Sequence, residues 1–243
     1  MSGHSKWSQI KRKKEIKDTQ KGQLFSKLSR LITLAVKESG GITDPEKNIK
    51  LRLAITKAKE YNMPKENIKR AVEKAKGMTE AMLKEVVYEV FAPGGVSLII
   101  LAATDNPNRT LSEIRKVLDL YGGKLGSSGS VLYNFEKVGM VAFEKEAFSE
   151  EQLLQLVEIL KVKDIDTSES EHVLYLPFEE LGHVEKKIGQ NFPKPAVIDI
   201  FYRPLTTVEI SDKEILGKIL SLVKALEELD DVHKVYDNCS ISS

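Results

Sequence analysis

The sequence predicts an α+β protein of three domains, and three features of its hydrophobic pattern lead to this fold class. Apolar residues recur at the helical period of about 3.6 residues from Ser5 to about Lys76. After Thr79 the pattern changes to the alternation that is typical of strands. Residues 138–204 then have the strands and helices of a whole domain, and this domain is inserted between two parts of the middle domain. The 243 residues suffice for two or three cores of about 50 to 150 residues each.

The first domain is expected to be all-helical. Apolar residues over 24–36 share one helical face, and this helix should end at Gly40-Gly41. Asp44-Pro45 predicts the N-cap and first position of a second helix, which Asn62-Met63-Pro64 would end. A third helix should stop at Gly77, because glycine is the commonest helix terminator.

The middle domain is expected to begin with a β-hairpin. Val86, Tyr88 and Val90 occupy alternate positions, Pro93-Gly94-Gly95 predicts a turn, and residues 96–103 form an apolar run typical of a buried strand. Residues 109–121 predict a helix, which a glycine-rich turn would connect to a third strand over 131–135. The first part of this domain therefore has three strands and one helix.

The inserted domain has the order βαββαβ, which is typical of ferredoxin-like folds. The expected elements are a strand at 140–143, a helix at 149–160, strands at 164–167 and 172–176, a helix at 178–188 and a strand at 197–201. A helix at 211–229 and a strand at 232–236 then complete the middle sheet, so we expect two ferredoxin-like α+β domains, the last inserted in the middle one. The predicted boundaries are 1–79 for the helical domain, 80–137 plus 205–243 for the middle domain, and 138–204 for the insertion.

The formal net charge of +1 conceals a division of charge along the chain. Residues 1–76 carry 20 Lys and Arg against 8 Asp and Glu, a net charge of +12. The rest of the chain carries 17 against 28, a net charge of −11. Such a division indicates one module that faces a polyanion and another that does a different task.

The densest positive charge lies near the N-terminus. Residues 1–30 contain nine Lys and Arg against two acids, and Lys11-Arg12-Lys13-Lys14 are too crowded to pair with Glu15 and Asp18 alone. Phosphates would neutralise them with a steep salt dependence, whereas the alternative is a solvated face. Trp7 could stack on an unpaired base or anchor its helix. The nucleic-acid-binding candidates are Lys6, Trp7, Lys11, Arg12, Lys13, Lys14, Lys17, Lys21, Lys27, Arg30, Arg52, Lys57, Lys65, Arg70 and Arg109.

The sequence contains no recognisable catalytic, metal or cofactor motif. The four histidines lack metal-ligand spacing, the single Cys239 forms neither a disulfide within the chain nor a cysteine zinc site, and no nucleophile motif is present. The glycine-rich segment 122–129 lacks the ending of a P-loop, so a tight turn is the better interpretation. We therefore expect a protein that is not an enzyme and uses no cofactor.

Other features set expectations about location and partners. No apolar run is long enough to cross a membrane, and no signal peptide opens the chain, so a cytoplasmic protein without a membrane partner is expected. No small-molecule substrate is evident. The acidic run Glu227, Glu228, Asp230 and Asp231 is interpreted as a solvated face, with an acidic patch for a basic partner as the alternative. Asn106 or Asn108 is expected to cap the helix after the hairpin, although Arg109 could face RNA or protein.

Several segments resemble the YebC/PmpR family over nearly the whole chain, most weakly between about 144 and 200. They are MSGHSKWSQIKRKK at 1–14, LRLAITKAK at 51–59, NMPKENIKR at 62–70, YE at 88–89, APGGV at 92–96, TDNPNRT at 104–110, GGKLGSSGSV at 122–131 and LDDV at 229–232. The resemblance implies three domains and a regulator of gene expression, described either as a promoter-binding transcriptional regulator or as a ribosome-associated translation factor. Its mitochondrial members are translational activators with an expected targeting extension, so a bacterial-type protein is favoured here. Pro107 departs from the Arg or Lys usual at that position, which removes one candidate phosphate contact.

Three functional hypotheses follow. In the first, a translation factor contacts ribosomal RNA with its basic helices, while its acidic domains reach toward ribosomal protein or the nascent chain. In the second, the same basic surface binds DNA, although no recognition helix rich in Asn or Gln is evident. In the third and weakest, the α+β domains bind a metabolite or catalyse a reaction. An RNA-recognition sheet is not expected, since residues 136–143 lack its aromatic motif.

Overall fold

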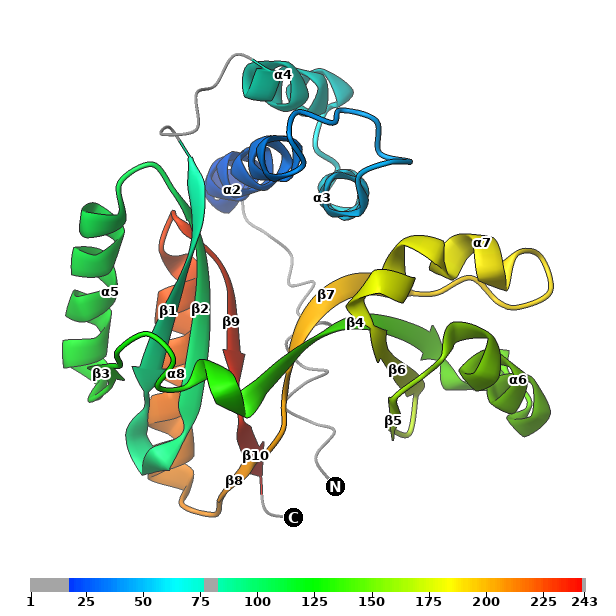
Figure 1. Ribbon diagram of the computed structural model, residues 1–243. Coiled ribbons are helices and arrows are strands. Elements are labelled where there is room, and N and C mark those ends of the chain that lie inside the picture. The colour runs from blue at the N-terminus through cyan, green and yellow to red at the C-terminus, as the bar shows by residue number, and fades with distance from the viewer. Residues whose placement is uncertain (1–17, 77–82, 242–243) are drawn as a thin grey trace. The chain divides into compact units, whose positions relative to one another are not determined.

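The computed structural model describes residues 18–76 and 83–241 of the chain (Figure 1). The described chain divides into two compact units. One is Phe135–Leu205, and the other contains the helices before residue 77 together with the middle sheet and its helices. The α+β fold class with an N-terminal helical region is confirmed, and the insertion begins and ends within three residues of the expected positions.

The helical region contains α2 (Asp18–Glu38), α3 (Ile49–Glu60) and α4 (Lys65–Lys76). Both α3 and α4 pack against α2. Their shared core consists of Leu28, Ile32, Ala35, Val36, Leu51, Ala54, Ala58, Met63, Ile68, Ala71 and Ala75. The apolar faces expected from the helical period are therefore the faces that are buried.

The start of α3 was predicted wrongly. Asp44 only closes a turn, in which its Oδ1 accepts a hydrogen bond of 3.0 Å from the Glu46 N–H. The N-cap is Asn48, whose Oδ1 accepts from the Leu51 N–H at 3.1 Å. The buried Asn48 amide also donates to the Ala35 carbonyl at 2.9 Å, which ties the loop to α2. The helix begins where this side chain is held.

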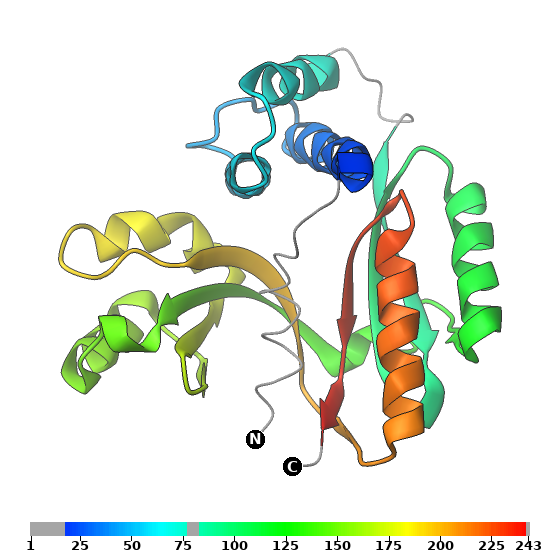
Figure 2. The same cartoon turned by 180° about the vertical axis from the view of Figure 1, so that it is seen from behind.

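The middle sheet has the strand order β3-β1-β2-β9. Its strands are β1 (Lys84–Phe91), β2 (Ser97–Thr104), β3 (Lys124–Leu125) and β9 (Val232–Asp237). The predicted hairpin is confirmed, with Tyr88 opposite Ile100. Helices α5 (Pro107–Tyr121) and α8 (Lys213–Glu228) contact each other over one face of the sheet, as Figure 2 shows from behind. Strands β8 (Val208–Ile210) and β10 (Cys239–Ile241) form a separate parallel pair.

The third strand of the middle sheet was placed wrongly. Residues Leu132–Asn134 form a 3₁₀ turn, and Phe135 already begins β4 of the other unit. The strand that pairs with β1 is the two-residue β3. The cause is Glu89, whose carboxylate accepts hydrogen bonds from the N–H groups of Val131 and Leu132 in the expected strand, and from that of Gly129 in the turn before it. Those groups are therefore not free to pair in a sheet.

The Phe135–Leu205 unit has the expected βαββαβ order. Its elements are β4 (Phe135–Glu144), α6 (Glu150–Leu160), β5 (Asp164–Thr167), β6 (Glu171–Pro177), the 3₁₀ helix η4 (Phe178–His183), α7 (Val184–Ile188) and β7 (Val197–Pro204). The sheet order β5-β6-β4-β7 places a third strand between the two strands that each helix connects, as in a ferredoxin-like fold. The middle sheet departs from that order, because its hairpin β1–β2 occupies the centre.

Candidate nucleic-acid interface

Helix α4 carries the most available positive charge in the described chain. Its twelve residues, KENIKRAVEKAK, include five cations and two acids. The alternation of charged residues with Ile68, Ala71 and Ala75 buries one face and leaves all five cations exposed. Within residues 18–76 and 83–241, these cations make no side-chain hydrogen bond or ion pair; they are Lys65, Lys69, Arg70, Lys74 and Lys76.

Two cations of α2 have partners at the end of α8 and in the turn that follows. Lys27 Nζ donates to the Glu227 carbonyl at 2.5 Å, and Arg30 Nη1 donates to the Asp230 carbonyl at 3.0 Å. Burial lowers the pKa of Lys27 despite the nearby acids Asp230 and Glu227, which raise it. These two cations therefore hold α2 against the middle domain, and little of their charge is available for a phosphate.

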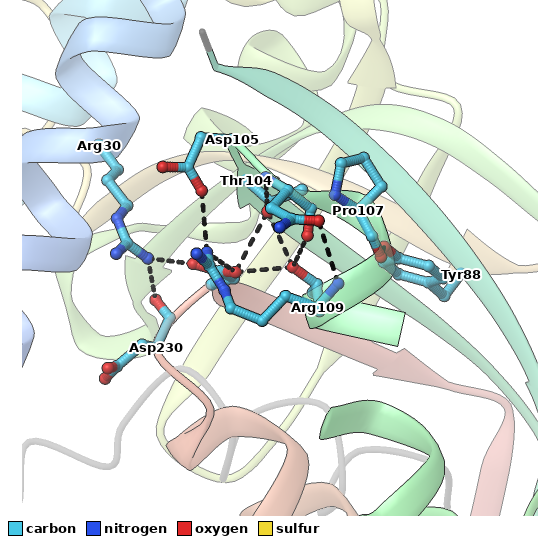
Figure 3. A network of polar contacts seen from close by, with 10 residues as sticks. Arg30, Tyr88, Thr104, Asp105, Pro107, Arg109 and Asp230 are labelled. Atoms are coloured by element: carbon cyan, nitrogen blue, oxygen red, sulfur yellow. Dashed lines mark hydrogen bonds and ion pairs between the residues drawn. The ribbon is translucent and has the colours of Figure 1, made fainter. Parts of the chain in front are cut away.

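The carboxylate of Asp231 is the centre of a buried polar network. Figure 3 shows this network from close by, with its members Arg30, Thr104 and Arg109 labelled. Its Oδ1 accepts from Arg30 Nη1, and its Oδ2 accepts from Arg109 Nη2 at 2.7 Å. The hydroxyls of Thr104 and Thr110 also donate to Oδ2, at 3.1 and 2.6 Å. The side chain of Asp231 is only 2% exposed.

The charge of Asp231 is stabilised by these donors. Burial alone would raise its pKa, but the hydrogen bonds from Thr110 and Arg109 and the charge of Arg30 together lower the pKa below its usual 3.8. The interpretation of residues 227–231 as a purely solvated acidic face is therefore wrong for Asp231. An unpaired carboxylate would not be tolerated at this depth, and this one is paired by two arginines from distant parts of the chain.

Arg109 lies at the start of α5. Asn106 caps this helix by accepting from the Arg109 N–H at 3.2 Å, and Pro107 occupies the first turn, where its missing N–H costs nothing. The Arg109 guanidinium donates to Asp105 at 2.9 Å as well as to Asp231, and hydrogen bonding to Asp231 raises its pKa. The capping role expected for Asn106 is confirmed, and the structure gives Arg109 two acidic partners.

The remaining described candidates differ in how accessible they are. Arg52 Nη1 lies 3.7 Å from Glu46 Oε2, and its side chain is 18% exposed. Lys57 is half-buried near His233, whose pKa is lowered by burial and further by Lys57. Lys21 is exposed on α2. Of the candidates that the structure describes, Lys65 and Arg70 are the two that are exposed and lack an intramolecular partner among the described residues.

Seven candidates lie outside the described residues: Lys6, Trp7, Lys11, Arg12, Lys13, Lys14 and Lys17. Their roles stay predictions. The described residues contain no group of three His, Cys, Asp or Glu that could hold a metal ion. Among the same residues, no helix is long and apolar enough to cross a membrane.

The structural roles of two buried carboxylates, Asp231 and Glu89, were not predicted from the sequence. Asp231 lies in the resembling segment LDDV, but its partners are 121 to 201 residues away, so sequence spacing gave no signal. Glu89 is a charged residue in the alternating strand β1, and its side chain is buried. Its carboxylate holds the glycine-rich segment in place, which agrees with the expectation of a structural turn there.

Comparisons with known proteins agree with this architecture. Residues 5–78 match the family model described as the TACO1/YebC protein N-terminal domain, and residues 83–239 match the model described as the TACO1/YebC second and third domain. A probable transcriptional regulatory protein of Aquifex aeolicus is 44% identical over 242 residues, which cover 99% of this chain and 96% of the relative. One from Syntrophomonas wolfei is 42% identical, over 99% of this chain and 97% of the relative. The crystal structure of the conserved hypothetical protein Aq1575 from Aquifex aeolicus superposes with a TM-score of 0.85 at 43% identity, covering 98% of both chains.

Proposed function

This chain belongs to the TACO1/YebC family, and from that premise we propose that it is a non-enzymatic regulator that binds ribosomal RNA and activates translation. The observation that carries the proposal is the contrast among its cations. Lys27, Arg30 and Arg109 are engaged by partners inside the chain, whereas the five cations of α4 are exposed and have no partner in the described residues.

The free charge of α4 favours a polyanionic partner. Cations that already have an acidic partner gain little from a phosphate, but exposed unpaired ones release the counterions of the nucleic acid when they bind. Helix α4 adds to the basic N-terminal segment, with Lys11-Arg12-Lys13-Lys14 as its densest part. Residues 77–243, which form the middle and inserted domains, carry a net charge of −11, so we expect a phosphate backbone to be attracted to the helical region instead.

Co-sedimentation with ribosomes at low salt tests the proposal. The variant Lys65→Glu with Lys69→Glu should reduce the bound fraction several-fold, because it reverses two exposed charges on α4. A matched control is Arg115→Glu with Lys116→Glu, which reverses two exposed charges on α5 and should bind like the wild type. Reversal of Lys11 to Lys14 to glutamate should also release the protein. Failure of the wild type to co-sediment, or an equal loss in the control variant, would refute the proposal.

A second candidate function is transcriptional regulation through DNA, which the names of the relatives favour. Competition between a promoter duplex and its scrambled sequence separates the two. A promoter-specific regulator would bind the promoter more tightly at the same salt concentration, whereas equal affinities leave only the sequence-independent phosphate attraction. We propose the ribosomal target because the basic helices carry few of the Asn and Gln side chains with which proteins read adenine edges in the major groove: α3 has none, and α4 has only Asn67.

A further inference from the structure

A pocket of about 580 Å³ lies along α2 and α4, within the larger compact unit. Helix α2 contributes Gly22, Phe25, Ser26, Ser29, Arg30 and Thr33, and α4 contributes Asn67, Arg70, Ala71 and Lys74. Leu83 and Asp105 complete the lining. The size falls within the range of about 300 to 1,000 Å³ that is usual for small-ligand sites.

The shape follows from the sequence of the two helices. Positions 22, 26 and 29 lie on one face of α2 and carry glycine and serine. Because these side chains are small, they leave open space between α2 and α4 where the two helices pack together. The helices are held together next to the pocket, where the hydroxyl of Thr33 donates to the Ala71 carbonyl at 3.1 Å. The pocket is therefore a feature of the packing of α2 against α4.

The lining has the chemistry of a nucleotide site. Arg70 and Lys74 follow each other by one turn of α4, are exposed, and have no intramolecular partner in the described chain, so a phosphate could bind both. Phe25 is a half-buried aromatic ring against which a base could stack. Ser26, Ser29 and Asn67 add hydroxyl and amide groups that can bind a ribose or a base edge.

We infer that this pocket takes one unpaired nucleotide of a folded RNA, with its phosphate between Arg70 and Lys74 and its base against Phe25. The inference rests on the proposed function and adds to it the kind of RNA element that is recognised. Bulges and loops of folded RNA present such nucleotides already unstacked. Duplex DNA would first have to extrude a base, at a cost that weakens its binding.

Anisotropy binding to two RNA hairpins that differ by one bulged nucleotide tests the inference on the full chain. The wild type should prefer the bulged hairpin by about tenfold, the size expected from stacking one base on an aromatic ring. The variant Ser26→Trp fills the pocket from an exposed position without changing a charge, so it should keep the affinity for the paired hairpin and lose the preference. Ser221→Trp on α8 adds the same bulk at an exposed position outside the pocket. This variant should keep both the affinity for the paired hairpin and the preference for the bulged one.

The outcomes separate the two proposals. Equal binding of both hairpins by the wild type overturns the pocket and leaves RNA binding standing, whereas no binding of either overturns both. A preserved preference in Ser26→Trp also overturns the pocket. A bulged DNA hairpin that binds as tightly as the bulged RNA overturns the assignment to RNA. Because Ser26→Trp could disturb folding, Arg70→Gln serves as a second variant, expected to weaken binding of the bulged hairpin more than that of the paired one.

Discussion

Arg30 on α2 and Asp231 just before β9 form an ion pair across 201 positions of the sequence. The same carboxylate receives Arg109 from the start of α5, so one buried acid joins three elements. The network gives Arg30 and Arg109 a structural role, although both were candidates for binding nucleic acid. It also identifies, by contrast, the cations that remain available for a ligand.

Replacing Asp231 with alanine should destabilise the fold. The variant leaves Arg30, Arg109 and two threonine hydroxyls without their shared acceptor, and the two arginines are exposed enough to be partly rehydrated. We expect a loss of about 2 to 4 kcal/mol in the free energy of unfolding, measured with urea. Asp230→Ala removes an exposed neighbouring carboxylate and should cost less than about 0.5 kcal/mol. Equal effects of the two variants would contradict the network.

Glu89 should make stability depend on pH. Burial acts to raise its pKa, but hydrogen bonds from the N–H groups of Val131, Gly129 and Leu132 outweigh it and lower the pKa below 4.5. Because the pKa of Glu89 is lower in the folded protein, its stabilisation of the fold is fully present at a pH above its pKa in the unfolded chain. This stabilisation is lost as the pH falls through its pKa in the folded protein. Glu89→Gln should cost about 1 to 3 kcal/mol at neutral pH and flatten the decline in acid. Urea titrations between about pH 6 and pH 3 test this, and an unchanged acid slope would rule out the role.

Alanine substitutions at two adjacent glycines should distinguish the cost of backbone strain from the cost of steric crowding. Gly94 and Gly95 both have positive φ, of +74° and +78°. A Cβ on Gly94 would lie 2.8 Å from Ile210 Cδ1 and 2.9 Å from Ile215 Cγ2, whereas a Cβ on Gly95 meets nothing within 4 Å. Gly95→Ala should therefore cost about 1 to 2 kcal/mol through strain alone. Gly94→Ala should cost at least about 1 kcal/mol more, which thermal or urea unfolding would reveal.

The engaged and the available arginines should differ in the salt dependence of RNA binding. Arg70→Gln removes one phosphate contact and should reduce the slope of log K against log salt by about 1. Arg109→Gln removes a cation that is already paired with Asp231, so the slope should stay the same while the protein unfolds more easily. Anisotropy titrations at several salt concentrations provide both slopes. A reduced slope for Arg109→Gln would place that residue in the interface.

The sequence predicted those elements whose period extends over several residues. The helices of the basic region, the hairpin β1–β2 and the βαββαβ order of the insertion all have such a period. Strands β3, β8 and β10 have two or three residues each, which is too short for any period, and they were missed. The false strand at 131–135 has residues suited to a strand, but the N–H groups of Val131 and Leu132 donate to the carboxylate of Glu89, which is 42 and 43 positions away in the chain.

The candidate interface was predictable only in part. Composition located the positive charge in the helical region, but it could not distinguish Arg30 from Arg70. That distinction depends on whether a carboxylate lies nearby in space, and Asp231 is remote in the chain from Arg30. The side-chain pattern of α4 did contain a signal, because its buried residues recur at the helical period and leave every cation on the outside.

The insertion leaves and rejoins the larger unit at neighbouring positions, since Phe135 at the start of β4 pairs with Pro204 at the end of β7. Phe135–Leu205 can therefore be regarded as one long loop inserted into the larger unit, and the two ends of this loop lie on neighbouring, paired strands. The entropy of closing a loop rises only slowly with its length, so this loop could lengthen or shorten during evolution at little cost to the rest. A tight turn joining Asn134 to Thr206 would then yield a minimal protein that keeps the basic helices and the Asp231 network.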